Sequence, residues 1–142
     1  MSSSIVDEST DFGARVLRRL QNEQIVWLTT VGGDGTPQPS PVWFLWQGGL
    51  ALVYSRPDVP KLKNIARSPR VALCFNTTPD GGDVVVLTGT AEILAKSPPA
   101  NAVPEYAAKY DQGIRNLGMD AVGFGAAYRV AIRITLEKVR GF

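Results

Sequence analysis

The chain has 142 residues with one cysteine and no histidine, and its 15 Lys and Arg against 13 Asp and Glu give a formal net charge of +2. Without histidine the sequence cannot supply a Ser-His-Asp triad, a Cys-His pair or a His-ligated metal, and one cysteine allows neither an internal disulfide nor a Cys-based zinc motif. The length is typical of a single domain, expected over residues 1–142, and the small charge argues against a dedicated nucleic-acid binder.

Residues 1–8 have neither the basic start nor the apolar run of a signal peptide, and we expect them to be a flexible tail. The longest unbroken apolar runs, such as VWFLW at 42–46, are too short to cross a membrane. We therefore expect a cytoplasmic protein without a membrane partner.

The first predicted element is an amphipathic helix that begins at Thr10 or Asp11 as the cap. The run FGARVLRRLQ places apolar side chains on one stripe: Phe12, Val16, Leu17 and Leu20. A strand is predicted next over residues 25–31, and Gly32-Gly33-Asp34-Gly35 is typical of a hairpin turn.

The second predicted strand, Gln38–Trp46, begins with Pro39 and Pro41, which cannot donate to a sheet ladder. Its start is therefore an edge or a break, where backbone carbonyls and the Ser40 hydroxyl are free for a ligand. Both faces of this strand are apolar, with Val42, Phe44 and Trp46 on one side and Trp43 and Leu45 on the other. We expect a second subunit to cover the outer face, which predicts a homodimer.

The central stretch, residues 50–76, reads as a strand, a short helix and a second strand. Leu50–Ser55 alternates with a period of two, and so does Val71–Asn76. Between them Pro60 is suited to the first helical position, Asp58 lies close enough to cap the helix, and Ser68-Pro69 ends it.

Positive charge gathers at the start of this helix. Lys61 and Lys63 lie in the first turn, where the helix dipole disfavours cations, and Arg56 and Arg67 flank them. Cations around free backbone N–H groups form a candidate anion site. The alternative is a solvated basic helix whose lysine stems cover apolar surface.

The remaining elements are a turn at 77–83, a strand at 84–94 with Gly89 as a bulge, a helix at 101–117, a Gly-rich loop at 118–127 and a strand at 128–136. One face of the helix at 101–117 carries Val103, Tyr106, Ala107 and Tyr110. About six strands joined mostly by hairpin turns, with short helices, predict a mainly β protein built as a small antiparallel barrel.

The order of these segments resembles the pyridoxamine 5'-phosphate oxidase-like split-barrel superfamily, and more closely its branch of small flavin and deazaflavin-dependent reductases. The resemblance is carried by four segments: IVWLTTVGGDGTPQPSPVWF, LVYSRPDVPKLKNIARSPRVAL, VLTGTAEI and YRVAIRITLEKVRGF. The chain lacks the C-terminal Arg and Trp pattern and the histidine of true pyridoxamine phosphate oxidases, which argues against vitamin B6 oxidation.

The resemblance implies a six-stranded, Greek-key split β-barrel that forms a homodimer with two cofactor sites at the subunit interface. It also implies that the cofactor phosphate meets one set of residues: Ser55, Arg56, Lys61, Lys63 and Asn64. The flavin-like ring would be lined by a second set: Gln38, Ser40, Pro41, Val42 and Trp43. Arg129 and the terminal Phe142 would close the site.

We interpret the chain as a reductase that passes a hydride from reduced coenzyme F(420), an 8-hydroxy-5-deazaflavin, to an unsaturated small organic acceptor. Tyr54 adjoins the ligand segment and is counted among the cofactor-binding residues. Tyr54 and water are both open as the proton donor. One alternative is the same fold carrying FMN, as an oxidase or flavin reductase. Another is a non-enzymatic barrel that binds nucleic acid through its basic turn and exposed aromatic residues.

Overall fold

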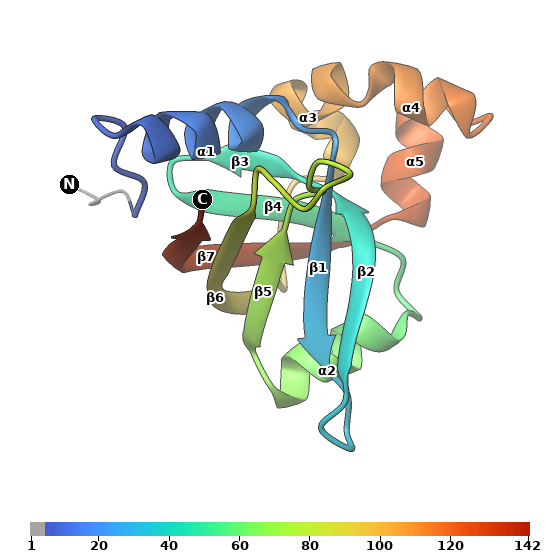
Figure 1. Cartoon of the computed structure of the whole chain (residues 1–142). Coiled ribbons are helices and arrows are strands. Elements are labelled where there is room, and N and C mark those ends of the chain that lie inside the picture. Colours follow the sequence, from blue (N-terminus) through green and yellow to red (C-terminus); the bar gives the residue numbers. More distant parts are fainter. Residues whose placement is uncertain (1–4) are drawn as a thin grey trace.

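The computed structural model describes residues 5–142 and consists mainly of β-strands with short helices (Figure 1). In chain order the elements are α1 (Asp11–Asn22), β1 (Ile25–Val31), β2 (Pro37–Trp43), β3 (Leu45–Gln47), β4 (Leu50–Ser55), α2 (Pro60–Arg67), β5 (Arg70–Cys74), β6 (Val85–Ile93), the 3-10 helix η1 (Ala100–Ala102), α3 (Pro104–Lys109), α4 (Asp111–Asn116), α5 (Ala121–Ala127) and β7 (Val130–Gly141). None of the helices within residues 5–142 is long and apolar enough to cross a membrane.

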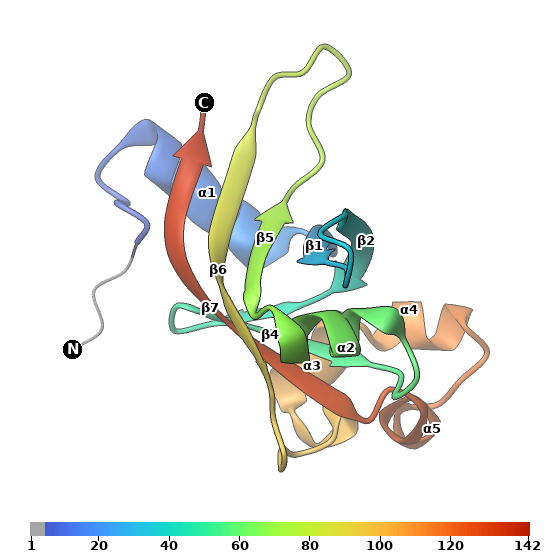
Figure 2. The ribbon, with the colours of Figure 1, turned by 90° about the horizontal axis from the view of Figure 1, so that it is seen from below.

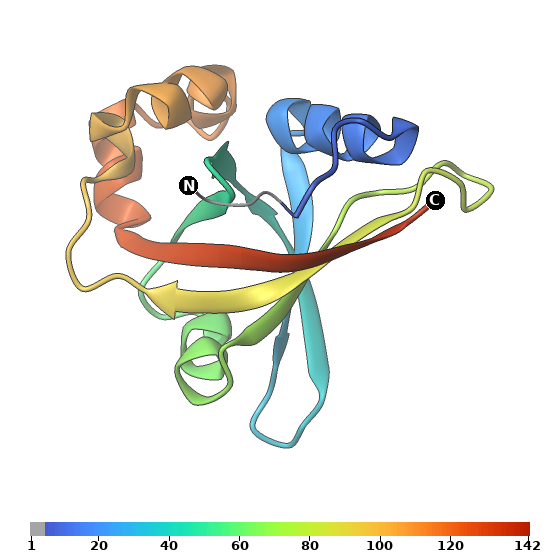
Figure 3. The same ribbon diagram turned by 90° about the vertical axis from the view of Figure 1, so that its left-hand side faces the viewer.

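The strands form one antiparallel, seven-stranded sheet in the order β2-β1-β5-β6-β7-β4-β3. Its two edge strands, β2 and β3, are separated in the chain by Phe44 alone. The sheet is therefore curled, and the chain passes directly from one edge to the other (Figures 1 and 3). The expected count of six strands was wrong because the single strand predicted over Gln38–Trp46 is divided at Phe44.

The break at Phe44 has a specific cause. The Phe44 N–H donates to the Tyr110 hydroxyl (2.8 Å), and the Phe44 carbonyl accepts from the Lys109 ammonium (2.7 Å). The Tyr110 hydroxyl itself donates to the Gln24 carbonyl (2.7 Å). Because side chains from the end of α3 take the Phe44 backbone groups, the chain leaves β1 and pairs with β4 instead.

One core fills the interior of the curled sheet, and α1 and α2 contribute to it from opposite sides (Figure 3). Thr10 begins α1 by accepting a hydrogen bond from the Gly13 N–H (2.9 Å), and the helix buries Val16 and Leu20. On the other side α2 buries Ile65, and it faces the viewer in Figure 2.

A second core lies between the outer face of β3, β4 and β7 and the helices η1 to α5. Leu45, Tyr54 and Ala131 pack there against Tyr106 and Phe124. The chain's own helices thus cover the face that we expected a second subunit to cover, and the two apolar faces of this strand no longer argue for a dimer. The homodimer itself stays a prediction.

Two predicted segments near the C-terminus were wrong. The helix expected over 101–117 is divided into η1, α3 and α4, and the loop expected over 118–127 contains the helix α5. The Asp120 carboxylate caps α5 by accepting from the Gly123 N–H (2.7 Å). The last strand also extends to Gly141, well beyond the predicted end at residue 136.

Three smaller expectations concern the N-terminal tail, the N-cap of α2 and the bulge at Gly89. Residues 1–4 of the predicted flexible tail lie outside the described residues, but Val6 is buried in the core, so residues 5–8 are not a loose tail. Val59 and not Asp58 is the N-cap of α2, and it makes no side-chain capping bond. The bulge expected at Gly89 is confirmed by a register shift between Thr88 and Gly89 in the pairing of β6 with β7.

Candidate functional site

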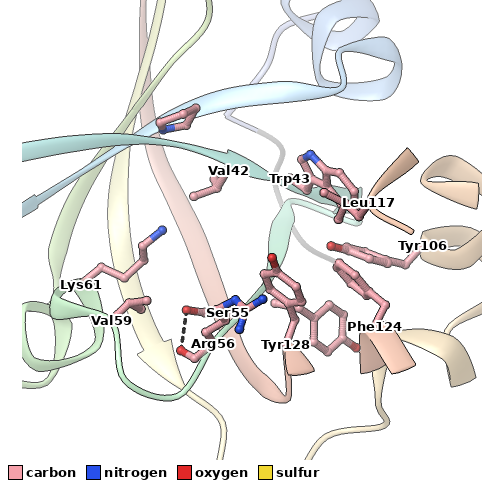
Figure 4. Close-up of a pocket in the computed structure, with 12 residues that line it drawn as sticks. Val42, Trp43, Ser55, Arg56, Val59, Lys61, Tyr106, Leu117, Phe124 and Tyr128 are labelled. Atoms are coloured by element: carbon pink, nitrogen blue, oxygen red, sulfur yellow. Dashed lines mark hydrogen bonds between the residues drawn. The ribbon is translucent and has the colours of Figure 1, made fainter. Parts of the chain in front are cut away.

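A cavity of about 290 Å³ lies between the curled sheet and the C-terminal helices (Figure 4). Its walls come from β2, β4, the β4–α2 connection, the first turn of α2, α3, α5 and the residues that directly follow α4 and α5. The lining residues are Pro41, Val42, Trp43, Tyr54, Ser55, Arg56, Val59, Lys61, Tyr106, Leu117, Phe124 and Tyr128. No aspartate or glutamate is among these residues, so the cavity wall is neutral or positive.

One side of the cavity, the cation half, is formed by Ser55, Arg56, Val59 and Lys61. Lys61 is half-buried, and burial lowers the pKa of its ammonium below the ordinary value. Within residues 5–142 no carboxylate lies within ion-pair distance of Lys61. An anionic ligand binds most favourably at a half-buried cation that has no counter-charge.

The start of α2 adds to this preference. The helix has Pro60 in its first turn, no acidic residue there and no side-chain cap, so nothing in the turn offsets the partial positive charge of the helix end. Next to it the Arg56 guanidinium carbon lies 4.9 Å from the centre of the Tyr128 ring, and the Ser55 hydroxyl donates to the Arg56 carbonyl (2.9 Å). The start of α2 and the side chains of Arg56 and Lys61 thus all favour a negatively charged ligand.

The other side of the cavity, the aromatic half, is formed by Trp43, Tyr106, Phe124 and Tyr128. Trp43 and Phe124 stack with ring centres 5.4 Å apart and 17° between their planes, and Phe124 stacks on Tyr128 at 4.4 Å and 16°. Behind them Tyr110 lies parallel to Trp43 at 4.5 Å. Because these rings stack on one another, they present a rigid apolar wall to the cavity, which is suited to the apolar part of a ligand.

The sequence of the chain matches the model of one known protein family. The family model described as pyridoxamine 5'-phosphate oxidase matches residues 12–142. The chain belongs to the pyridoxamine 5'-phosphate oxidase family. No curated protein sequence matches the chain significantly.

Several solved structures resemble the chain in fold. One is an F(420) reductase, at 23% identity and a TM-score of 0.65 over 87% of this chain and 94% of that one. Another is a putative pyridoxamine 5'-phosphate oxidase from Listeria innocua, at 22% identity and 0.63 over 89% and 94%. A heme storage protein from Vibrio cholerae matches at 13% identity and 0.65 over 93% and 95%. At these identities the likeness shows the fold alone.

The family binds flavins and includes oxidoreductases, and the cavity can be tested against such a cofactor. The lone ammonium of Lys61 fits a phosphate, and the stacked rings of the aromatic half fit a flat heterocycle. The chain has no histidine, which is the proximal heme ligand of globins and peroxidases.

Most of the residues predicted to bind the cofactor line the cavity: Pro41, Val42, Trp43, Tyr54, Ser55, Arg56 and Lys61. Asn64 and Gln38 lie together elsewhere. The Asn64 amide donates to the Thr30 hydroxyl (3.0 Å) and to the Gln38 side-chain oxygen (2.9 Å), and its own oxygen accepts from Arg67 (3.0 Å). Buried Asn64 therefore fastens α2 to β1 and β2 and has no hydrogen left to donate to a ligand.

The other predicted site residues do not line the cavity. Ser40 is half-buried in β2, and Lys63 and Arg129 are exposed. Phe142 is 70% exposed, and its backbone pairs with Val84 at the far end of β7.

Several lining residues were not predicted from the sequence: Val59, Tyr106, Leu117, Phe124 and Tyr128. Most of them belong to α3, α5 and the segments that follow α4 and α5. Tyr106 and Tyr110 were placed on one face of a predicted helix, and that spacing was the available signal. It did not indicate that the face points toward the residues after β4.

Tyr54, the one side chain considered as a proton donor, has another role. Its hydroxyl donates to the Pro98 carbonyl (2.8 Å), and burial raises the pKa of the phenol. The proton is thus held by the backbone that leads into η1. Tyr54 fixes that connection to β4 and is not poised to release a proton near neutral pH.

Proposed function

We propose that this chain is an oxidoreductase that binds coenzyme F(420) and passes a hydride from its reduced form to an unsaturated small organic acceptor. The observation that carries the proposal is the position of Lys61, a half-buried ammonium without a counter-charge in the described structure, across the cavity from a wall of stacked rings. That combination fits a molecule with a phosphate at one end and a flat ring at the other.

The residues of this chain would bind and orient the cofactor. Lys61 and Arg56 would hold the phosphate, with the free start of α2 beside them. Pro41, Val42 and Trp43 would lie along the ring, and the aromatic half would exclude water from it. Exposed cations such as Arg67 would contact the anionic glutamate tail of coenzyme F(420).

When bound, the cofactor would supply the hydride, which carries two electrons, and solvent would supply the one proton that completes the reduction. The protein's contribution is to hold donor and acceptor in one dry cavity, which makes the transfer effectively intramolecular.

A cavity of about 290 Å³ is near the lower limit for sites that enclose a small molecule. We therefore propose that a second copy of the chain completes the site in a homodimer. Sedimentation at micromolar concentration should give twice the monomer mass, and a clean monomer would refute the homodimer.

FMN is the second candidate, because the family match supports flavin binding in general. The same cation half would hold its phosphate, and the protein would act as an oxidase or flavin reductase.

Titration of the purified protein with each cofactor, followed by cofactor fluorescence, separates these proposals. Colourless protein that binds added coenzyme F(420) at micromolar concentration supports the first, and yellow protein that carries FMN supports the second. Binding of neither cofactor, together with salt-sensitive binding of single-stranded nucleic acid, would refute both and favour a nucleic-acid-binding barrel.

A further inference from the structure

The inner end of the aromatic half contains a buried hydroxyl without a hydrogen-bond partner. Tyr106 is 0% exposed, and its hydroxyl is the buried side-chain group within residues 5–142 for which no partner is found. The neighbouring buried tyrosines differ in this respect, because Tyr54 donates to the Pro98 carbonyl and Tyr110 bonds to Phe44. Buried polar groups in native proteins are nearly always satisfied, so this exception requires an explanation.

The position of Tyr106 suggests the explanation. The residue lines the cavity, and in Figure 4 its side chain points toward the space between Trp43 and Tyr128. Burial raises the pKa of the phenol far above its ordinary value, so the group stays a neutral O–H donor at any physiological pH. An unpaired donor directed toward a cavity would be satisfied by an acceptor atom on a ligand that reaches it.

The surroundings of the hydroxyl define what that ligand can be. One charged side chain, Arg56, lies against the aromatic half, with its guanidinium 4.9 Å from the Tyr128 ring. The rings of Trp43 and Phe124, with no charged residue between them, stack beside the hydroxyl. A charged group placed there would lose its hydration without gaining a partner. The half therefore favours a flat, uncharged molecule.

We propose that the Tyr106 hydroxyl donates a hydrogen bond to a carbonyl-type oxygen of a flat, uncharged ligand that lies against the aromatic half. This inference rests on the proposed function only in taking that ligand to be the molecule that is reduced. A conjugated carbonyl compound satisfies both requirements, since its oxygen accepts the bond and its double bond accepts the hydride.

The hydroxyl is sealed in this structure, so a ligand reaches it only when lining side chains separate. Leu117 belongs to the same wall and is 51% exposed, just beyond the end of α4. Displacement of Leu117 would cost less packing than movement of the buried rings.

The competing explanation is that Tyr106 only fills space. Its ring meets Tyr54 edge-on at 4.9 Å and lies 4.9 Å from Tyr110 at a tilt, contacts that a phenylalanine would also make. If packing were its whole role, removal of the hydroxyl would not alter the preference for one ligand over another.

The test compares two flat bicyclic probes, chromone, which has a conjugated carbonyl, and naphthalene, which has none. Equilibrium dialysis measures the dissociation constant of each probe for the wild-type chain and for Tyr106→Phe. We expect Tyr106→Phe to weaken chromone binding about 2- to 12-fold, as for loss of one neutral hydrogen bond, and to leave naphthalene unchanged. We also expect its denaturation midpoint to be equal to or above that of the wild type.

Tyr110→Phe is the matched control, because its hydroxyl is satisfied by the backbone and lies outside the cavity wall. It should lower stability and keep the ratio of the two dissociation constants. Equal loss of both probes in Tyr106→Phe, or no loss of either, would overturn the inference. So would a wild-type protein that binds naphthalene as tightly as chromone.

The cofactor titration separates this inference from the proposed function. Failure of coenzyme F(420) and FMN to bind, with the chromone preference still dependent on Tyr106, would remove the proposed function and support the ligand site. The opposite result is tight cofactor binding together with a ratio of chromone to naphthalene dissociation constants that Tyr106→Phe leaves unchanged. That result would support the proposed function and remove the Tyr106 ligand site.

Discussion

The Phe44 N–H donates to the hydroxyl of Tyr110, 66 residues later in the chain, at 2.8 Å. Phe44 is the point where the chain leaves one edge of the sheet and joins the other. The same hydroxyl lies 2.7 Å from the Gln24 carbonyl, just before β1. One phenol therefore joins the C-terminal helices to both ends of the β1–β2 hairpin, and through Trp43 to the cavity wall.

Removal of this hydroxyl should destabilise the fold. Tyr110→Phe leaves the buried Phe44 N–H without a partner, and we expect the free energy of unfolding to fall by about 1–3 kcal/mol. Urea denaturation measures the change. Tyr128→Phe is the control, because no hydrogen bond of the half-buried Tyr128 hydroxyl is found in the described structure and its loss should cost less than about 0.5 kcal/mol. Equal effects of the two substitutions would contradict the role given to Tyr110.

Cofactor affinity should depend on Lys61 and not on Lys63. Lys61→Ala removes the half-buried ammonium of the cation half, and loss of a charged hydrogen bond to phosphate costs about 1.5–3 kcal/mol, or about 10- to 150-fold in affinity. Lys63→Ala removes an exposed charge outside the cavity wall and should change affinity less than about 3-fold. Fluorescence titration with coenzyme F(420) measures both. The reverse order would place the phosphate outside this cavity.

Stability should rise with pH through the titration of Lys109. Burial lowers the pKa of its ammonium to about 8, against 10.5 for an ordinary lysine, and nearby Glu23 only partly opposes this. Between these values the unfolded chain binds more protons than the folded one, so the free energy of unfolding increases with pH in that window. Neutral Lys109 can still donate to the Phe44 carbonyl.

Comparison with Lys109→Met isolates this effect from other groups. Burial also raises the pKa of Tyr106 and Tyr110, which opposes the rise only above about pH 10, where unfolded tyrosines ionise. Urea midpoints measured near pH 7.5 and 9.5 should increase more for the wild type than for Lys109→Met. An identical change in the two proteins would show that Lys109 has no such role.

Asn64 should matter for stability and, through α2, for the cofactor. Asn64→Ala leaves Thr30 and Gln38 without their buried donor, and we expect a loss of about 1–3 kcal/mol in the free energy of unfolding. The position of Lys61 one turn earlier should become less defined, with weaker cofactor binding. Arg67→Ala, which removes one bond at the exposed end of α2, is the control and should have a small effect on stability. Intact stability in Asn64→Ala would refute the fastening role.

Local sequence signals predicted the parts of the fold that local chemistry determines. Thr10 caps α1 as expected, because a hydroxyl next to an amphipathic run satisfies a free N–H of the first turn. The alternation of Leu50–Ser55 predicted β4, and Gly89 marked the bulge where any side chain would meet the Thr135 backbone. The same segments carried the family resemblance.

The features that sequence reasoning missed depend on distant residues. Nothing near Phe44 indicates a break, since the groups that take its backbone bonds belong to Lys109 and Tyr110. Gly123 and Gly125 favoured a loop, although Asp120 was a readable cap for a helix there. Tyr106 was placed on the correct helix face, but only the folded chain shows that this face meets the cavity.

The two halves of the cavity come from separate parts of the chain, the cation half from the β4–α2 connection and most of the aromatic half from the segment between β6 and β7. The halves meet where the Arg56 guanidinium lies over the Tyr128 ring, so mutations away from that contact can alter one half while the other keeps its geometry. Exchange of the single segment between β6 and β7 could therefore change the substrate while cofactor binding is retained. Residues 94–129 are the natural target for redesign of specificity.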